Sequence, residues 1–212
     1  MYIVFEGIVG TGKTTHSKKL AQYLKKKYPK KKVIWTREPG GTEISQKVRE
    51  IAQGSKYANE MDPICEVYLY AASRAQSLRE IVKPALDKQN IVVADRSYIT
   101  ALVNQGIGKK LGIKKVMSIN KEAVGNTVPD LVIFLDYGVE KSIKRTFDKE
   151  EDKWENFGTD FYKITRDGYI KISKMKQFKD KWITVKMNDS SVEENFSNLV
   201  KKVDKIISKR IK

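Results

Sequence analysis

The stretch "YIVFEGIVGTGKTTHSKKLAQYLKKKY", residues 2–28, decides the fold of this chain. Its centre, "GIVGTGKTT" (7–15), satisfies the pattern G-x-x-x-x-G-K-[ST], whose glycines let successive backbone N–H groups turn inward around phosphate oxygens. A β-forming segment precedes the loop, and Leu20, Leu24 and Tyr28 recur after it at helical spacing. The stretch predicts a strand, a phosphate-binding loop and a helix; the alternative is a plain glycine turn with an incidental lysine.

Two side chains of the loop have separate roles in this pattern. Lys13 is expected to reach the β and γ phosphates of a nucleotide, and Thr14 to place its hydroxyl on Mg²⁺. The helix that begins there points the positive end of its dipole at the anion. The loop therefore predicts a site for a nucleotide with its magnesium ion.

The rest of the chain alternates between β-forming and helical segments. The β-forming segments are "YIVF" (2–5), "KVIWT" (32–36), "NIVVAD" (90–95), "DLVIFLD" (130–136) and "WITVKM" (182–187). Helical periodicity runs over 14–28, 43–53, 63–88, 114–126, 138–149, 160–180 and 192–210. Several β-forming segments are continuous apolar runs, which is typical of strands buried on both faces. The alternation predicts an α/β fold, a doubly wound parallel sheet with helices on both faces.

Length and composition set limits on the kind of protein. The 212 residues suit a single domain, 1–212. No run of about 18 apolar residues occurs, and the N-terminus enters a strand without a charged leader, so we expect a cytoplasmic protein that does not contact membranes. Cys65 and His16 are the only cysteine and histidine, which excludes an intrachain disulfide, cysteine-based metal sites and histidine triads.

The formal net charge is +16, from 42 Lys+Arg against 26 Asp+Glu. Such a charge attracts nucleic acid or any polyanionic substrate. Much of it lies in lysine runs such as "KKKYPKKK" (25–32), which are typical of solvated turns and helix faces. We therefore expect nucleic acid not to be the main partner.

The segments that carry polar motifs follow strands. In parallel sheets, ligands bind outside the carboxyl ends of the strands, where the loop 7–15 and the segments after Thr36 and Ala94 are expected to meet. The charged segment "FDKEEDKWENFGTDF" (147–161) interrupts the helical pattern. It is either a solvated turn or a short lid that closes over phosphates.

Phosphate-binding loops serve several classes of enzyme, so a second motif must discriminate. The guanine-reading N-K-x-D of GTPases is absent, because residues 120–123 read "NKEA", and no strand ends in the paired acids of a motor ATPase. Four other motifs occur in order: "TREPGGT" (36–42), "YLYAASR" (68–74), "DRSYITALVNQG" (95–106) and "DKWENFGTDFY" (152–162). With these motifs the chain resembles the thymidylate kinases, which make dTDP from dTMP and ATP.

The resemblance implies a P-loop NTPase fold with a five-stranded parallel sheet, the substrates ATP and dTMP, Mg²⁺, a homodimer and a role in dTTP supply. An acceptor that is already a phosphate monoester has its second ionisation near 6, so its oxygen is a ready nucleophile and no catalytic base is required. The site must then supply in-line positioning and positive charge. This requirement fits the arginines and lysines of the motifs.

By resemblance, each motif contributes a set of site residues. The ATP-binding set is Gly7, Ile8, Val9, Gly10, Thr11, Gly12, Lys13, Thr14, Thr15, Arg145, Lys186 and Asn188. The catalytic set is Lys13, Asp95, Arg96, Arg145 and Lys153, with Thr14 and Asp95 at the metal. The substrate-binding set is Arg37, Glu38, Arg49, Tyr70, Arg74, Arg96, Thr100, Asn104 and Gln105.

The resemblance also implies individual roles. Arg96 clamps the acceptor phosphate, and Asp95 helps to hold Mg²⁺ or orients Arg96; a structural ion pair between them is the alternative. Tyr70 stacks on thymine, unless it is simply core packing, and Arg74 donates to the O4 atom of the base. The Gln105 amide offers a donor and an acceptor to the base edge.

Two positions sort the subtype of kinase. Family members with glycine at the position of Gly10 take a catalytic cation from the lid, as in the lid-arginine bacterial subtype. Lys153 stands where the lid usually has that arginine, and a lysine cannot fork to two oxygens. Arg145 and Lys149 are other candidates for the cation.

Two departures fall where the family touches the sugar. Val9 occupies a position that usually carries Asp or Glu for the 3′-hydroxyl, and Asn104 replaces an aromatic that disfavours a 2′-hydroxyl. A site that loses such contacts discriminates less between analogues. We therefore expect intact base reading with relaxed or rebuilt sugar reading.

Two rival functions are kept open at this point. A deoxynucleoside kinase phosphorylates a neutral hydroxyl, so Glu38 would have to act as general base, and Arg49 would lack an obvious partner. A P-loop protein that binds nucleotide or nucleic acid without turnover would show salt-dependent binding to DNA and no ADP release.

Overall fold

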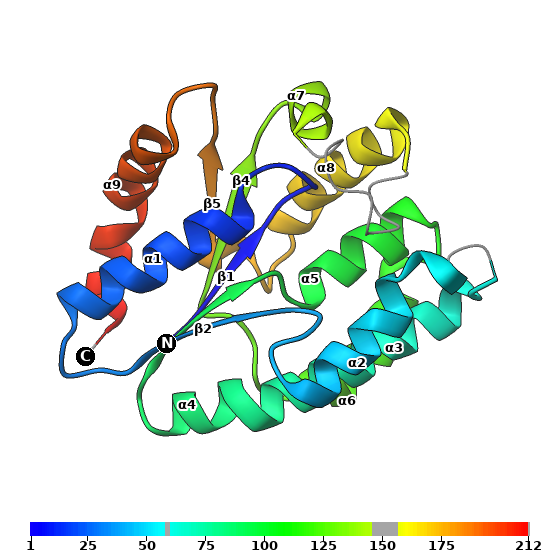
Figure 1. The fold of residues 1–212 in the computed structure, drawn as a ribbon, viewed down its shortest axis with the longest axis horizontal. Helices are drawn as coiled ribbons and strands as arrows, with labels where there is room; N and C mark the ends of the chain where they lie inside the picture. Colours follow the sequence, from blue (N-terminus) through cyan, green and yellow to red (C-terminus); the bar gives the residue numbers. More distant parts are fainter. Residues whose placement is uncertain (58–59, 146–156, 212) are drawn as a thin grey trace.

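The computed structural model describes residues 1–57, 60–145 and 157–211. In this part of the chain, five parallel strands form one sheet in the order β2-β3-β1-β4-β5 (Figure 1). The strands are β1 (Tyr2–Glu6), β2 (Val33–Arg37), β3 (Ile91–Asp95), β4 (Leu131–Asp136) and β5 (Trp182–Lys186). Each lies within one residue of its predicted bounds, so the predicted α/β fold with a five-stranded parallel sheet is confirmed.

Helices connect the strands and cover the sheet. The α-helices are α1 (Lys13–Lys27), α2 (Glu43–Gln53), α3 (Pro63–Ser77), α4 (Lys83–Asp87), α5 (Tyr98–Ala101), α6 (Ile113–Val124), α7 (Val139–Lys144), α8 (Thr159–Ser173) and α9 (Val192–Arg210). Shorter 3₁₀ turns are η1 (Ser55–Tyr57) and η5 (Lys179–Lys181), and π-helical segments are η2 (Leu78–Val82) and η3 (Leu102–Gly108).

Two helical segments differ from the sequence prediction. Residues 98–108 form α5 and η3, although no helix was predicted there. The helix predicted over 160–180 ends at Ser173 and is followed by a separate 3₁₀ turn. Of the predicted lid, 147–161, residues 147–156 lie outside the described residues, and 159–161 form the first turn of α8.

Alternate residues of the central strands enter two cores. Ile3, Phe5 and Ile133 pack with α1 and α9 on one face, whereas Val4 and Phe134 pack with α3, α6 and α8 on the other. Side chains alternate across a strand, so burying both faces requires apolar residues at every position. This explains the continuous apolar runs in the strand sequences.

The sheet brings the polar ends of its inner strands together. The register pairs Phe5 of β1 with Asp95 of β3, and Asp95 with Arg37 of β2. The residues that follow each strand therefore begin at one edge of the sheet, as predicted. Within the described ranges, no helix combines the length and apolar character needed to cross a bilayer.

Candidate active site

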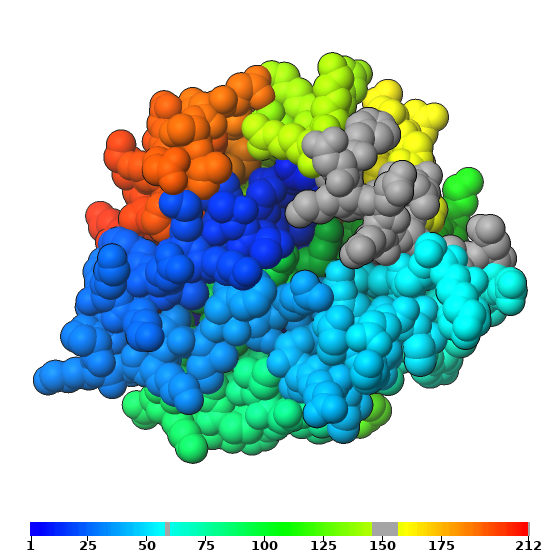
Figure 2. Space-filling model, in the orientation of Figure 1, coloured from blue at the N-terminus to red at the C-terminus, as the bar shows by residue number. Residues whose placement is uncertain are grey.

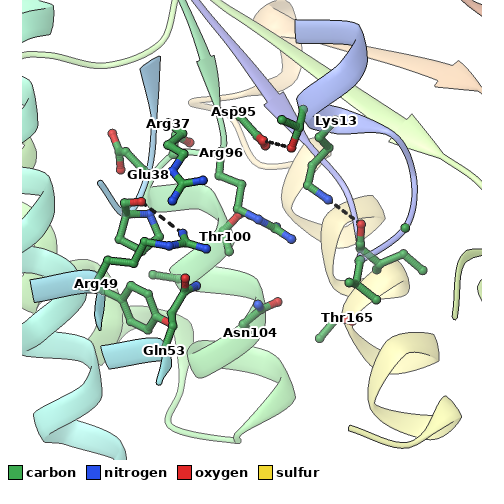
Figure 3. A pocket seen from close by; sticks show the side chains of 18 of the residues that line it. Lys13, Arg37, Glu38, Arg49, Gln53, Asp95, Arg96, Thr100, Asn104 and Thr165 are labelled. Atoms are coloured by element: carbon green, nitrogen blue, oxygen red, sulfur yellow. Dashed lines mark hydrogen bonds between the residues drawn. The ribbon is translucent and has the colours of Figure 1, made fainter. Parts of the chain in front are cut away.

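The carboxyl ends of β1, β2 and β3 border a cavity of about 400 Å³. Its walls come from the loop after β1, from α2 and α3, from the segment after β3 and from α8. The surface is hollowed between the P-loop segment, in dark blue, and the α2–α3 segment, in cyan (Figure 2). Side chains from elements far apart in the sequence face this one cavity (Figure 3).

Most of the predicted site residues line the cavity. They are Ile8, Val9, Gly10, Gly12, Lys13, Thr14, Thr15, Arg37, Glu38, Arg49, Tyr70, Arg74, Asp95, Arg96, Thr100, Asn104, Gln105 and Arg145. Gly7, Thr11, Lys186 and Asn188 are not part of the lining, and Lys153 lies outside the described residues.

Six lining residues were missed by the sequence reasoning. These are Pro39, Gln53, Ser97, Ala101, Tyr162 and Thr165. A signal existed for Gln53, because it follows Arg49 by four residues and so shares its helix face. No comparable signal exists for Thr165, since it enters the site through the docking of α8.

The phosphate-binding loop needs glycine at position 10 for two reasons. Gly10 has φ +72°, a left-handed conformation that other residues rarely adopt. A Cβ atom there would also lie 1.9 Å from the backbone oxygen of Ser142 in α7. The loop therefore has no room for a side chain at this position, which gives a physical reason for the glycine that sorted the subtype.

Lys13 is held inside the loop. Its side chain is 7% exposed, and Nζ donates a hydrogen bond of 2.6 Å to the carbonyl oxygen of Ile8 (Figure 3). Burial, followed by the nearby Arg96 cation, lowers the pKa of Lys13 to about 7, although Asp95 and Glu6 act in the opposite direction. Binding of a phosphate would supply the counter-charge that this ammonium group needs.

Thr14 and Asp95 meet across the sheet edge. The Thr14 hydroxyl donates to Oδ2 of Asp95, and Oδ1 of Asp95 is buried with no hydrogen-bond partner among the described residues. Two hard oxygen donors side by side suit a magnesium ion.

Arg96 is fixed by its backbone and by a buried carboxylate. Its φ of +74° is unusual for a residue with a side chain, and such strain is typical of functional positions. Nη1 donates to the Gly7 carbonyl at 3.1 Å and to Oγ1 of Thr100 at 3.2 Å. Thr100 in turn donates to Glu6 at 2.6 Å, so the buried Glu6 carboxylate orients an acceptor for Arg96.

Two more arginines face the same region. Arg37 donates to the Gln46 side chain at 3.3 Å, and Arg49 donates to the Pro39 carbonyl at 3.2 Å. The side chains of Arg37, Arg49 and Arg96 gather around one part of the cavity (Figure 3). The combined positive charge favours an anionic ligand at this end.

Glu38 and Arg74 form a buried ion pair at the far wall. Nε of Arg74 lies 2.7 Å from Oε2 of Glu38, and the two side chains are only 4% and 3% exposed. The Tyr2 hydroxyl donates to the other oxygen of Glu38 at 3.3 Å. Burial raises the pKa of Glu38, and the Arg74 guanidinium opposes that rise. Both oxygens of Glu38 are thus engaged within the protein.

The remaining predicted base-binding residues lie between these groups. Tyr70 is 5% exposed and packs with Ala52 and Phe161, yet it also borders the cavity, so packing and ligand contact are compatible. Oε1 of Gln105 is buried and without a hydrogen-bond partner in the described part of the chain. The Asn104 amide lines the cavity and makes no hydrogen bond to the described residues.

Arg145 marks the other end of the cavity, beside the loop. Its guanidinium lies 4.3 Å from the ring centroid of Tyr137, within cation–π distance. Lys186 is exposed at the end of β5, and the backbone of Asn188 is held by Asn195, which accepts from its N–H at 3.2 Å. Their predicted contact with adenine stays a prediction.

Comparisons with known proteins agree with this geometry. A family model described as thymidylate kinase matches residues 5–199. The chain is 40% identical over 216 residues to a thymidylate kinase of Mycoplasma mobile, covering 99% of this chain and 100% of that protein. It is 39% identical over 184 residues to a thymidylate kinase of Thermoanaerobacter sp., covering 87% and 88% of the two chains.

A solved structure extends the comparison to three dimensions. The crystal structure of thymidylate kinase from Ehrlichia chaffeensis superposes with a TM-score of 0.75 at 27% identity, covering 96% of this chain and 98% of that chain. The family model spans most of the sequence, and the relative from Mycoplasma mobile matches end to end. The chain therefore belongs to the thymidylate kinase family.

Proposed function

We propose that this chain transfers the γ-phosphoryl group of ATP to dTMP and releases ADP and dTDP, as its family membership implies. The observation that carries the proposal is one cavity with a phosphate-binding loop at one end, Arg37 and Arg49 at the other, and Arg96 between them (Figure 3). Two anionic groups held in such a cavity face one another, which is the arrangement that phosphoryl transfer requires.

The reaction needs positioning and charge from the protein. A phosphate oxygen of dTMP forms a bond to the γ-phosphorus, and the bond from that phosphorus to the β–γ bridging oxygen breaks. The acceptor is already ionised, so no proton has to be removed. Lys13 holds the donor phosphates, and Arg96 holds the acceptor phosphate, with Thr100 and Gly7 fixing its guanidinium.

The residues present also fit a magnesium ion. The orphaned Oδ1 of Asp95 and the hydroxyl of Thr14 are oxygen donors, and a loop-bound nucleotide would add phosphate oxygens. Bound there, Mg²⁺ supplies positive charge to the phosphate oxygens of ATP. Asp95 and Thr14 would hold it, directly or through water.

The rival nucleoside kinase is not favoured. It requires Glu38 as a general base, but the two oxygens of Glu38 accept from Arg74 and Tyr2 inside the protein. A base must be free to accept the proton of the substrate hydroxyl. The family match points the same way.

Other parts of the assignment also follow from family membership. We infer that residues 1–212 act as one domain, that Lys153 or Arg145 supplies the lid cation, and that the enzyme works in the cytoplasm for dTTP synthesis. A homodimer is supported by exposed apolar side chains on neighbouring helices, Ile44 and Ile51 on α2 and Tyr68 on α3. Light scattering of the purified protein tests the dimer, since a monomeric mass would contradict it.

The activity is tested by ADP release from ATP and Mg²⁺ with dTMP, dUMP, UMP, dCMP and thymidine as acceptors. We expect dTMP to be the best acceptor. Turnover of thymidine without turnover of dTMP would instead make the protein a nucleoside kinase. If the protein binds ATP but releases no ADP with any of these acceptors, it is a nucleotide-binding module and not a kinase.

A further inference from the structure

Gln105 is expected to read the base, and its role depends on which way its amide points. An amide presents an oxygen acceptor at one end and an NH₂ donor at the other. An acceptor facing the ligand suits the N3–H of thymine or uracil, whereas a donor suits the unprotonated N3 of cytosine. The orientation of one side chain can therefore decide between dTMP and dCMP.

A buried carboxylate behind Gln105 fixes this orientation. Nε2 of Gln105 donates to Oε1 of Glu66 at 2.9 Å. A carboxylate accepts hydrogen bonds and has none to donate, so only the NH₂ end of the amide can face it. Oε1 of Gln105 is left buried and without a hydrogen-bond partner among the described residues, and Gln105 borders the cavity.

The Glu66 carboxylate is itself held in place. Its second oxygen accepts from Nζ of Lys109 at 2.7 Å, and the Glu66 side chain is 1% exposed against 21% for Lys109. Glu66 also lies in the first turn of the 15-residue helix α3, where the helix dipole stabilises a negative charge. The helix and the lysine together stabilise the negative charge of the Glu66 carboxylate and hold it behind Gln105.

The opposite role in the cavity belongs to Arg74. Its guanidinium uses Nε for Glu38 and Nη1 for Asn120, which leaves further N–H donors on a side chain that lines the cavity. A guanidinium has no acceptor. The cavity wall thus offers a donor from Arg74 and an acceptor from Gln105. In thymine, the donor meets the O4 oxygen and the acceptor meets the N3–H group. In cytosine, the same donor would face the N4–H₂ group and the same acceptor would face the unprotonated N3 atom.

We propose that Glu66, supported by Lys109, is a positioning residue that fixes the Gln105 amide with its oxygen toward the base and so makes the enzyme select thymine over cytosine. This inference rests on the proposed function. Glu66 and Lys109 act through Gln105 and are not expected to touch the reacting phosphates.

The test compares kcat/KM for dTMP and dCMP in the wild type and in Glu66→Gln. A glutamine at 66 can donate as well as accept, so the Gln105 amide is free to present either end. We expect the dTMP:dCMP ratio of kcat/KM to fall by about tenfold or more, with KM for ATP within about twofold of wild type. Calorimetric binding of dTMP and dCMP gives the same ratio without turnover.

A matched control and a rescue sharpen the test. Glu80→Gln is the control, because Glu80 accepts from Gln76 Nε2 at 2.7 Å on the exposed surface, and we expect it to leave the ratio unchanged. Adding Gln105→Glu to Glu66→Gln restores an acceptor to the cavity, since a carboxylate cannot present a donor. The double variant should recover preference for dTMP over the single variant.

The outcomes separate this inference from the proposed function. A folded Glu66→Gln protein whose ratio stays within about twofold of wild type overturns the inference, even if all rates fall together. Should that variant not fold, Lys109→Met takes its place, because it removes the cation that holds the Glu66 carboxylate beside Gln105. An unchanged dTMP:dCMP ratio in Lys109→Met would also overturn the inference. If the wild type neither binds nor phosphorylates dTMP, the proposed function fails instead.

Discussion

Lys13 should gain a proton from solution when a nucleotide binds. The pKa of this buried lysine is about 7 in the protein without nucleotide, against an ordinary value of 10.5. A phosphate beside the ammonium group stabilises the charged form and raises the pKa toward its ordinary value. The protonated state is thus the binding state, and affinity should fall as the pH rises above 7.

The size of the effect follows from the two pKa values. At pH 8, a lysine of pKa about 7 is about 90% deprotonated, and one of pKa about 10.5 is almost fully protonated, so binding should take up about 0.9 proton. At pH 6 the expected uptake is about 0.1 proton. Between pH 8 and 9, the Kd should rise about tenfold.

Calorimetry of MgADP binding measures the uptake. Titrations in buffers of different ionisation enthalpy give the number of protons as the slope of the observed enthalpy. The phosphates of ADP are ionised at pH 8, so they contribute little. In Lys13→Arg the guanidinium stays charged throughout, and the uptake should vanish.

A low proton count would refute this reasoning. If the wild type takes up less than about 0.2 proton at pH 8, or if its Kd is unchanged between pH 7 and 9, Lys13 is already charged in the free protein. The hydrogen bond to Ile8 and the neighbouring acids would then outweigh burial.

Three other perturbations test separate parts of the site. Arg74→Met removes the cation that pairs with the buried Glu38 carboxylate, so the free energy of unfolding in urea should fall by about 3–5 kcal/mol. A free energy of unfolding within about 1 kcal/mol of wild type would contradict a strong role for the buried pair. Gly10→Ala places a Cβ atom 1.9 Å from a backbone oxygen of α7, so the KM for ATP in steady-state kinetics should rise about tenfold or more. The control is Gly138→Ala, where the nearest atoms to an added Cβ belong to a flexible lysine at 4.0 Å, and this variant should leave the KM for ATP unchanged. Asn104→Tyr should raise the dUMP:UMP ratio of kcat/KM about tenfold, and an unchanged ratio would show that the asparagine does not relax sugar reading.

The sequence alone determined the strands, the phosphate-binding loop and most of the site. These features are encoded by neighbours in the chain: an apolar run gives a buried strand, and glycines at fixed spacing before Lys13 give the loop. The order of the parallel strands then brings the motifs after β1, β2 and β3 to one sheet edge. For this reason, most predicted site residues line the cavity.

The helix over residues 98–108 could not be predicted in the same way. Tyr98, Ile99 and Thr100 are β-branched or aromatic and favour strands by propensity. They are helical because the segment packs between α6 and α8. The second half of the segment is π-helical. Tertiary packing overrides local propensity here.

The partners of the buried charges were decided by the tertiary structure alone. Arg74 meets Glu38 from 36 residues away, and Gln105 meets Glu66 from 39 residues away. A sequence shows that such groups exist, but burial in a medium of low polarity requires each of them to find a partner, and only the packing of helices against the sheet sets which one it finds. That choice fixes whether an amide offers its oxygen or its nitrogen to the ligand.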